Sequence, residues 1–178
     1  MRQISAGRLR CAIVGGMDSC MTNPIKETDD AARSLASGLI ADARMAALAT
    51  LPLTGGFPMV TRVAVALIDG QLVTLVSDIA EHSQALSSNP ACSLLIAAPV
   101  KKGDPLAHPR ITVYARAEFR GAGEKESLRS AYLERHPKAE LYYDFVDFRL
   151  VRFTVDRADL NGGFGKAYRL GPDDLKPV

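Results

Sequence analysis

Four polar residues in the middle of the chain have side chains suited to holding an anion. Arg62 lies in the apolar stretch MVTRVAVALI, and Ser77, His82 and Ser83 lie in SDIAEHSQALSSNP. A guanidinium and nearby hydroxyl groups bind phosphate through charge-assisted hydrogen bonds. The residue types therefore indicate a phosphate site, provided that the fold brings residue 62 close to residues 77–83.

A β-hairpin is the first element that must position these groups. Strands are expected at residues 59–68 and 71–77, and the pair Asp69 and Gly70 between them is typical of a two-residue turn. Side chains alternate across a strand, so Arg62 shares a face with Ala64 and Ala66. These small neighbours leave room for a flat ligand beside the cation. In the alternative interpretation, Arg62 forms a surface ion pair and the alanines face a packed helix.

A short helix is expected after the hairpin. Asp78 followed by Glu81 resembles a capping box, so the helix should begin close to Ser77, and Asn89–Pro90 should end it. The free N–H groups at a helix start attract anions, and the two serines and the histidine lie within about one turn of it. Serine and aspartate are also ordinary helix caps, and a surface histidine is commonly just solvated.

The remaining patterns predict a mostly β (α+β) fold. A helix should start at Thr28 or Asp29, and the apolar segment 91–98 is typical of a central strand. The other strands are expected at 45–51, 110–120 and 148–157, with helical segments at 124–135 and after Pro137. Together they predict a closed antiparallel β-barrel with peripheral helices.

Composition limits the partners. The 178 residues carry 22 basic and 20 acidic side chains, which are interspersed, so nothing favours a nucleic-acid partner. No apolar run reaches the roughly 18 residues of a transmembrane helix, and a cytoplasmic protein without a membrane partner is expected. Cys11, Cys20 and Cys92 lack C-x-x-C spacing, which disfavours both a disulfide framework and a zinc site.

The domain organisation is expected to be simple. Residues 1–28 lack a sustained period and are interpreted as a flexible N-terminal tail, and residues 29–178 as one domain. Translation starting at Met17 or Met21 is an alternative.

The order of the motifs resembles a known family. Arg62 in a strand, a DG hairpin, the AEHS phrase, the NP that ends a helix and an apolar strand follow one another as in the FMN-binding split barrels related to pyridoxamine-phosphate oxidase, and most closely as in their haem utilisation branch. Three later segments agree: DPLAHPRITVYARAEF, YLERHPKAELYYDFVDFRLVRF and ADLNGGFGKAY. The resemblance covers about residues 31–170.

The resemblance implies an FMN site at the interface of a homodimer. Arg62 is expected on the inner barrel wall. The residues implied to contact FMN are Arg62 and Val63 at the ring, Arg62, Ser77, His82 and Ser83 at the phosphate, and Arg110 near the ring or ribityl chain. Closely related oxidases have a lysine near the position of His82, so FMN affinity should be weak or acid-dependent.

The glycine-rich segment 161–168 has two interpretations. Phe164, Gly165 and Lys166 can close over a cofactor from the partner subunit. Alternatively, the glycines simply permit positive φ at a sharp turn, and Phe164 plugs the barrel or the dimer seam.

The function predicted first is that of an FMN-dependent oxidoreductase acting on a small-molecule substrate, with the redox chemistry supplied by the flavin. Alternatives are a haem-binding or haem-degrading protein of the haem utilisation type and a non-catalytic flavin-binding protein. Longer relatives carry an additional C-terminal domain that contributes to their haem site, whereas only RLGPDDLKPV follows Tyr168 here. The sequence assigns no catalytic residue and no metal ligand.

Overall fold

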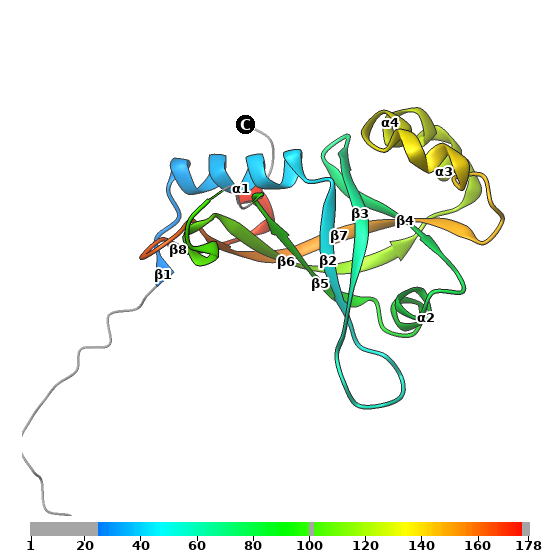
Figure 1. Cartoon of the computed structure of the whole chain (residues 1–178), viewed down its shortest axis with the longest axis horizontal. Coiled ribbons are helices and arrows are strands. Elements are labelled where there is room, and N and C mark those ends of the chain that lie inside the picture. Colours follow the sequence, from blue (N-terminus) through cyan, green and yellow to red (C-terminus); the bar gives the residue numbers. More distant parts are fainter. Residues whose placement is uncertain (1–24, 100–101, 176–178) are drawn as a thin grey trace, which may run out of the picture.

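Six antiparallel strands close into a barrel in the computed structural model, which describes residues 25–99 and 102–175 (Figure 1). The strands are β2 (Met45–Thr50), β3 (Met59–Ile68), β4 (Gln71–Ser77), β5 (Ala91–Ala97), β6 (Arg110–Phe119) and β7 (Phe148–Asn161). They pair in the order β7-β4-β3-β2-β5-β6, and β6 pairs back onto β7. The predicted antiparallel split barrel with peripheral helices is confirmed.

The hairpin of β3 and β4 has the predicted bounds and turn. Asp69 and Gly70 have φ values of 50° and 73°, the left-handed conformations that a two-residue turn of this kind requires. Beside the ladder, the Thr74 hydroxyl donates to the Ala64 carbonyl at 2.6 Å. The hairpin thereby fixes the direction in which every side chain of β3 points.

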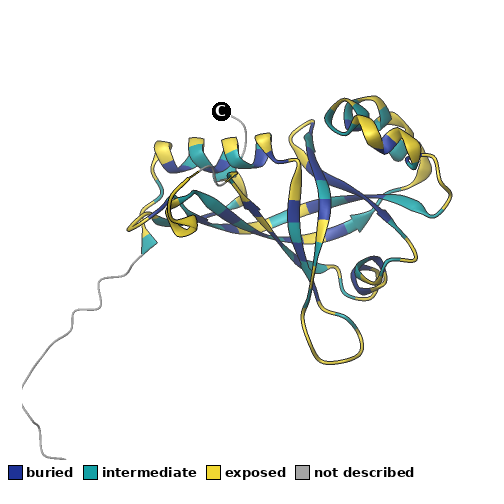
Figure 2. Ribbon diagram, viewed as in Figure 1, coloured by how far each residue is buried: buried dark blue, intermediate teal, exposed yellow. Residues whose placement is uncertain are grey.

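Alternate side chains divide the molecule into two apolar clusters. Val63 and Val65 of β3 point into the barrel with Leu48 and Leu94, where the main core lies. The opposite face of the β3–β4 hairpin supports a second cluster, formed by Ala66, Ile68, Val73 and Leu75 with Tyr132, Ala139, Tyr143 and Leu150. Figure 2 shows the buried residues alternating along the strands.

Helix α1 (Asp30–Asp42) begins where it was predicted. The Asp29 carboxylate accepts a hydrogen bond from the Ala32 amide at 2.7 Å, which caps the first turn. Ala32, Ala36 and Ile40 are buried in the main core, so α1 packs its predicted apolar face on the barrel. Figure 1 shows α1 running across the barrel near its β1–β8 end.

The other helices are short. They are α2 (Glu81–Ser88), α3 (Ala122–Ser127), α4 (Arg129–Arg135) and the 3-10 turns η1 (Pro105–Ala107), η2 (Pro137–Leu141) and η3 (Pro172–Leu175). The single helix expected at 124–135 is therefore interrupted at Leu128, where α3 ends and α4 begins. Helices α3 and α4 lie together over the β3–β4 end of the barrel (Figure 1).

Two arginines join α4 to the C-terminal end of α1. The Arg135 guanidinium donates to the carbonyl oxygens of Ala41 and Ala43, and Arg44 donates back to the Arg135 carbonyl. Helix C-termini leave such carbonyls without partners inside the helix. The arginines supply those partners and hold the end of α1 against the C-terminal end of α4.

Strand β7 is longer than predicted, and two further strands extend the sheet. It continues to Asn161, past a β-bulge in which Asp156 has no opposite residue on β6. β8 (Ala167–Leu170) pairs antiparallel with β7, and β1 (Ile25–Lys26) pairs parallel with β8. Residues 25 and 26 therefore form a strand although they lie within the predicted tail, whose residues 1–24 are outside the described part of the chain.

The Asp29 cap gives a stability prediction. Asp29→Ala should lower the free energy of unfolding by about 1 kcal/mol, because the Ala32 amide loses its acceptor. Chemical denaturation monitored by circular dichroism measures the loss. Glu27→Ala, which removes an exposed carboxylate two residues earlier, is the control and should change little. Equal losses in both variants would contradict a capping role.

Candidate functional site

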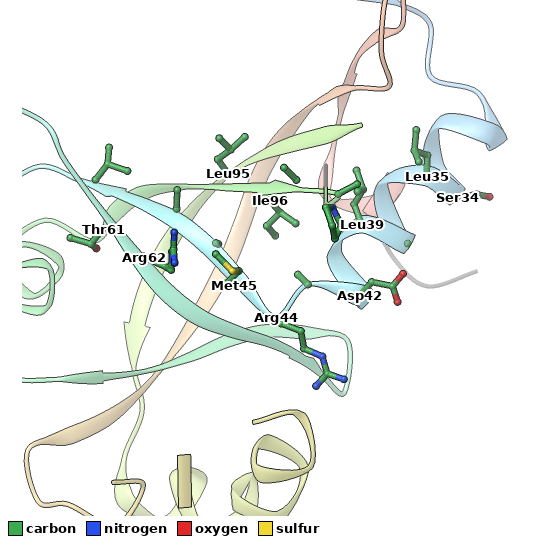
Figure 3. Close-up of a pocket in the computed structure, with 18 residues that line it drawn as sticks. Ser34, Leu35, Leu39, Asp42, Arg44, Met45, Thr61, Arg62, Leu95 and Ile96 are labelled. Carbon is green, nitrogen blue, oxygen red and sulfur yellow. The ribbon is translucent and has the colours of Figure 1, made fainter. Parts of the chain in front are cut away.

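A pocket lies between the C-terminal half of α1 and the outer face of β2, β3 and β5. Its volume is about 880 Å³. Figure 3 shows side chains from α1 on one side of it and from the three strands on the other. Apolar residues that line it are Leu35, Leu39, Met45, Val60, Leu95 and Ile96, and charged ones are Asp42, Arg44 and Arg62.

Small residues form much of the wall that the sheet contributes. Arg62 on β3 lies directly across from Ala47 on β2, which in turn lies across from Leu95 on β5. Ala97, two residues further along β5, also lines the pocket, and Gly38 leaves a gap in the wall formed by α1. The register therefore places one long cation beside a surface with few protruding side chains, as the sequence pattern predicted for a flat ligand.

Arg62 is on the outside of the barrel, so its expected place on the inner wall is wrong. The neighbouring residues Val63 and Val65 fill the inside, and alternation sends Arg62 to the opposite face. Its side chain is exposed, and no hydrogen bond or ion pair joins it to another residue of the described chain. The surface ion pair of the alternative interpretation is thus not seen among the described residues. Its second part, alanines that face a packed helix, holds for Ala66, which lies in the cluster beneath α4.

Helix α2 does not begin at the predicted capping box. It starts at Glu81, its N-cap residue is Ala80, and no side chain caps it. The Asp78 carboxylate instead faces the Arg149 guanidinium at 3.3 Å, and the Asp78 amide donates to the Asp147 carbonyl. The prediction that the helix starts close to Ser77 is therefore wrong, because residues from β7 and the loop before it hold Asp78.

The polar groups expected to bind phosphate are occupied or buried. The Ser77 hydroxyl donates to the Asp147 carboxylate at 2.6 Å. Ser83 is only 1% exposed, and its hydroxyl has no hydrogen-bond partner within the described structure. The structure does not present these two hydroxyls to the pocket that contains Arg62.

His82 approaches the pocket from the other side of β3. Its Nδ1 lies 3.4 Å from the hydroxyl of Thr61, a pocket residue adjacent to Arg62 in sequence. Because consecutive side chains of a strand point to opposite faces, His82 and Arg62 are separated by the strand itself. Burial lowers the pKa of His82, which favours the neutral imidazole at pH 7. The proposed phosphate roles of these residues stay predictions.

Neither Val63 nor Arg110 presents its side chain to the pocket: Val63 lies inside the barrel, and the Arg110 guanidinium is bonded to a neighbouring loop. Val63 is buried in the barrel and lies across from Ala46. Arg110 lies across from the pocket residue Ala97, but its guanidinium donates to the carbonyl oxygens of Leu106 and His108, at 3.1 Å and 3.4 Å. Arg110 is thus beside the pocket with its charge directed onto the preceding loop.

The glycine-rich turn adjoins the far end of the pocket. Gly163 and Gly165 have φ values of 110° and 69°, so the positive φ expected for a sharp turn is present. A side chain at Gly162 would come within 3.3 Å of Leu35, a pocket residue on α1. Phe164 is 77% exposed and Lys166 is also exposed, so Phe164 does not plug the barrel.

The wall contributed by α1 and the apolar side chains of Met45 and Leu95 were not anticipated as site residues. Apolar character on both faces of segment 91–98 is the available signal, and by itself it indicates only a central strand. In the structure β5 is indeed between β2 and β6, yet Leu95 is 43% exposed on its outer face. A central strand of a barrel can therefore still present a binding surface.

The described residues contain neither a membrane-spanning helix nor a cluster of metal-ligating side chains. None of the helices in residues 25–99 and 102–175 combines the length and apolar character needed to cross a membrane. In the same residues, no group of three or more His, Cys, Asp or Glu side chains is arranged to hold a metal ion.

Proteins similar to this chain are named for haem. The non-canonical heme oxygenase HOZ of Arabidopsis thaliana, a chloroplastic protein, is 40% identical over 84 residues, which are 47% of this chain and 25% of that protein. A heme binding protein from Mycobacterium smegmatis is 33% identical with a TM-score of 0.74, and the match covers 80% of this chain and 59% of that one. The chain thus spans less than two thirds of the length of each of these proteins.

A third comparison concerns the fold alone. A protein of the pyridoxinephosphate oxidase family from Clostridium acetobutylicum, related to general stress protein 26, has a TM-score of 0.64 at 15% identity, over 83% of this chain and 99% of that one.

The family described as "CREG, beta-barrel" matches residues 26–175, nearly the whole described chain. The split-barrel resemblance is confirmed, and the chain belongs to the CREG β-barrel family.

Proposed function

We propose that the protein binds haem in the pocket between α1 and the outer face of the barrel. Haem is a flat, largely apolar macrocycle with two carboxylates on one edge. Pockets for such ligands are concave, mainly apolar and of about 300–1,000 Å³, with a few polar groups that fix orientation. The pocket volume of about 880 Å³ lies within this range.

The arrangement around Arg62 is the observation on which the proposal rests. An arginine without a partner in the described chain stands beside Ala47 and Leu95, opposite the apolar side chains of Leu35 and Leu39. Arg44 also lines the pocket, but its guanidinium donates to the Arg135 carbonyl on α4, and Asp42 is the only acidic residue among the described lining residues. Apolar walls with an unpaired cation match an apolar ring with an acidic edge.

The names of two similar proteins also support haem binding. A heme oxygenase and a heme binding protein are 40% and 33% identical to this chain over the matched parts. Because each match covers only part of those proteins, their whole activities do not transfer to this chain by similarity. Bound haem would supply iron-centred redox chemistry, and the residues named above would hold and orient it.

FMN fits the site less well. Its phosphate was expected between Arg62, Ser77, His82 and Ser83, but the two hydroxyls are bonded to Asp147 or buried, and His82 lies across the strand from Arg62. A neutral imidazole also adds no charge to the phosphate. The FMN-dependent oxidoreductase predicted from sequence therefore has weaker support than the haem alternative.

We further propose that the pocket borders a homodimer interface, as the family resemblance implied. Val60, Met45 and Leu95 are 65%, 50% and 43% exposed on the same outer face. Exposed apolar side chains gathered in one place typically mark interaction surfaces. A second copy related by a two-fold axis would bury the same patch on both protomers.

Removing the pocket cation should weaken haem binding. Arg62→Ala is expected to raise the Kd for hemin about tenfold, because one charge-assisted hydrogen bond to a carboxylate is lost. Absorbance titration measures the Kd. The control is Arg116→Ala, which removes an exposed arginine paired with Asp156 outside the pocket. Failure of the unmodified protein to bind hemin would overturn the proposed function.

If FMN binds with its phosphate near His82, the Kd for FMN should depend on pH. Since burial lowers the pKa of His82 below its ordinary value of about 6.5, the imidazole gains charge only in acid. We expect FMN to bind more weakly than hemin at pH 7.5, and the FMN Kd to decrease as the pH falls to about 5.5. Fluorescence titration of His82→Gln should show no such decrease. Tight, pH-independent FMN binding would instead place the phosphate away from His82.

The dimer proposal is tested by a charge in the patch. Val60→Asp should convert the dimer to a monomer, because the carboxylate would have to be desolvated at the interface. Size-exclusion chromatography with light scattering measures the mass. Leu141→Asp changes a residue that is 78% exposed on η2, outside the pocket, and should leave the dimer intact. A monomeric unmodified protein contradicts the proposal.

A further inference from the structure

We infer that a second pocket, at the rim of the barrel, binds a small organic carboxylate. This pocket has a volume of about 300 Å³ and lies where β2 ends at Thr50 and β5 begins at Ala91, with residues of β6 and β7 completing its wall. Figure 1 shows β2 running from the end of α1 to the β2–β3 loop, so the two pockets lie toward opposite ends of that strand. The two sets of described lining residues have no member in common.

The β-bulge in β7 brings two charged side chains to this pocket. Asp156 has no opposite residue on β6. Val155 and Ala158 both pack in the main core, so Asp156 and Arg157 between them both face outward, whereas adjacent side chains of a regular strand alternate. Bulges often lie beside functional sites, where they redirect a side chain. Here the bulge places a guanidinium and a carboxylate in the wall of one pocket.

The positive charge of Arg157 is not neutralised. Its guanidinium lies over the Tyr114 ring, 3.8 Å from the ring centroid, and no hydrogen bond or ion pair joins it to another residue of the described chain. Stacking on an aromatic ring orients a guanidinium and leaves its N–H groups free for a carboxylate. The Asp156 carboxylate, by contrast, lies 3.5 Å from Nε of Arg116, which offsets its charge. The pocket therefore favours an anion.

Hydroxyl groups add further donors. Ser93 lies across from Tyr114, which lies across from Arg157, so the three side chains form one row on the outer face of β5, β6 and β7. Directly opposite side chains are about 5 Å apart, close enough to contact one ligand. Thr50, also a lining residue, is 2% exposed, and its hydroxyl has no hydrogen-bond partner within the described structure. Since buried polar groups normally have a partner, a ligand oxygen beside Thr50 would fill a gap in the hydrogen bonding.

The rest of the lining indicates that the anion has an apolar part. Leu51 is 52% exposed, Pro58 is also exposed, and both line the pocket from the ends of the β2–β3 loop. The volume is about a third of that of the pocket beside α1, so the ligand is much smaller than haem. A carboxylate attached to one small ring matches an unpaired guanidinium beside apolar side chains.

An NMR titration with benzoate tests this site. We expect saturable shifts centred on the backbone amides of Ser93, Tyr114 and Arg157, with a Kd of about 1 mM for a ligand of this size. Benzamide has the same shape without the charge, and acetate has the charge without the ring. Both should bind about tenfold more weakly than benzoate, and the cation benzamidine should not bind.

Two pairs of variants separate the charge from the apolar wall. Arg157→Ala should raise the benzoate Kd about tenfold, whereas Arg169→Ala, which removes an exposed arginine paired with Asp159 outside both pockets, should leave it unchanged. Leu51→Ala should weaken the binding of benzoate but not of acetate. Leu53→Ala, at a residue of the same loop that is 79% exposed and outside the pocket, is its control.

The inference is wrong if benzoate causes no saturable shift, if acetate binds as tightly as benzoate, or if benzamidine binds in its place. Shifts centred on Arg62 and Leu35 would put the anion in the pocket beside α1 and would also overturn it. Arg157→Ala should leave the hemin Kd unchanged, because Arg157 is outside the proposed haem pocket. Failure of hemin binding and failure of benzoate binding are therefore separate results.

Discussion

Pairing of β6 with β7 is the constraint on which the rest of the structure depends, because it closes the sheet and divides every strand into an inner and an outer face. The inner face is filled by one continuous core. Each outer surface then has to be covered by another element or left to solvent. Helix α1 packs its buried face against that core, whereas α4 and η2 cover part of the outer face. The pocket lies where β2, β3 and β5 emerge beyond the edge of α1.

Charge pairing separates Arg62 from other arginines on the barrel. Arg120 and Arg152 both bind the Glu118 carboxylate at 3.0 Å, and Arg149 faces Asp78 at 3.3 Å. Such half-exposed pairs contribute little to stability, but they neutralise the surface locally. Arg62 has no such partner in the described chain, and it stands among apolar side chains. An unneutralised cation beside apolar surface favours an anionic amphiphile over a small polar metabolite.

Local patterns predicted the hairpin and the start of α1, since a DG turn and an aspartate cap act within a few residues. The start of α2 was missed because Arg149 and Asp147, some seventy positions away, hold Asp78. Alternation placed Arg62 correctly with Ala64 but could not say which face closes inward. That choice depends on barrel closure, which no short segment encodes. The pocket, assembled from α1 and three strands, was beyond local patterns for the same reason.

The reciprocal hydrogen bonds between Arg135 and Arg44 have a mechanical consequence. The carbonyls at the end of α1 are held by a side chain from α4, while α4 receives Arg44 at its own C-terminus. The end of α1 also forms one wall of the pocket. That wall can therefore be displaced only if α4 moves with it or if these hydrogen bonds break, so the two helices are mechanically coupled.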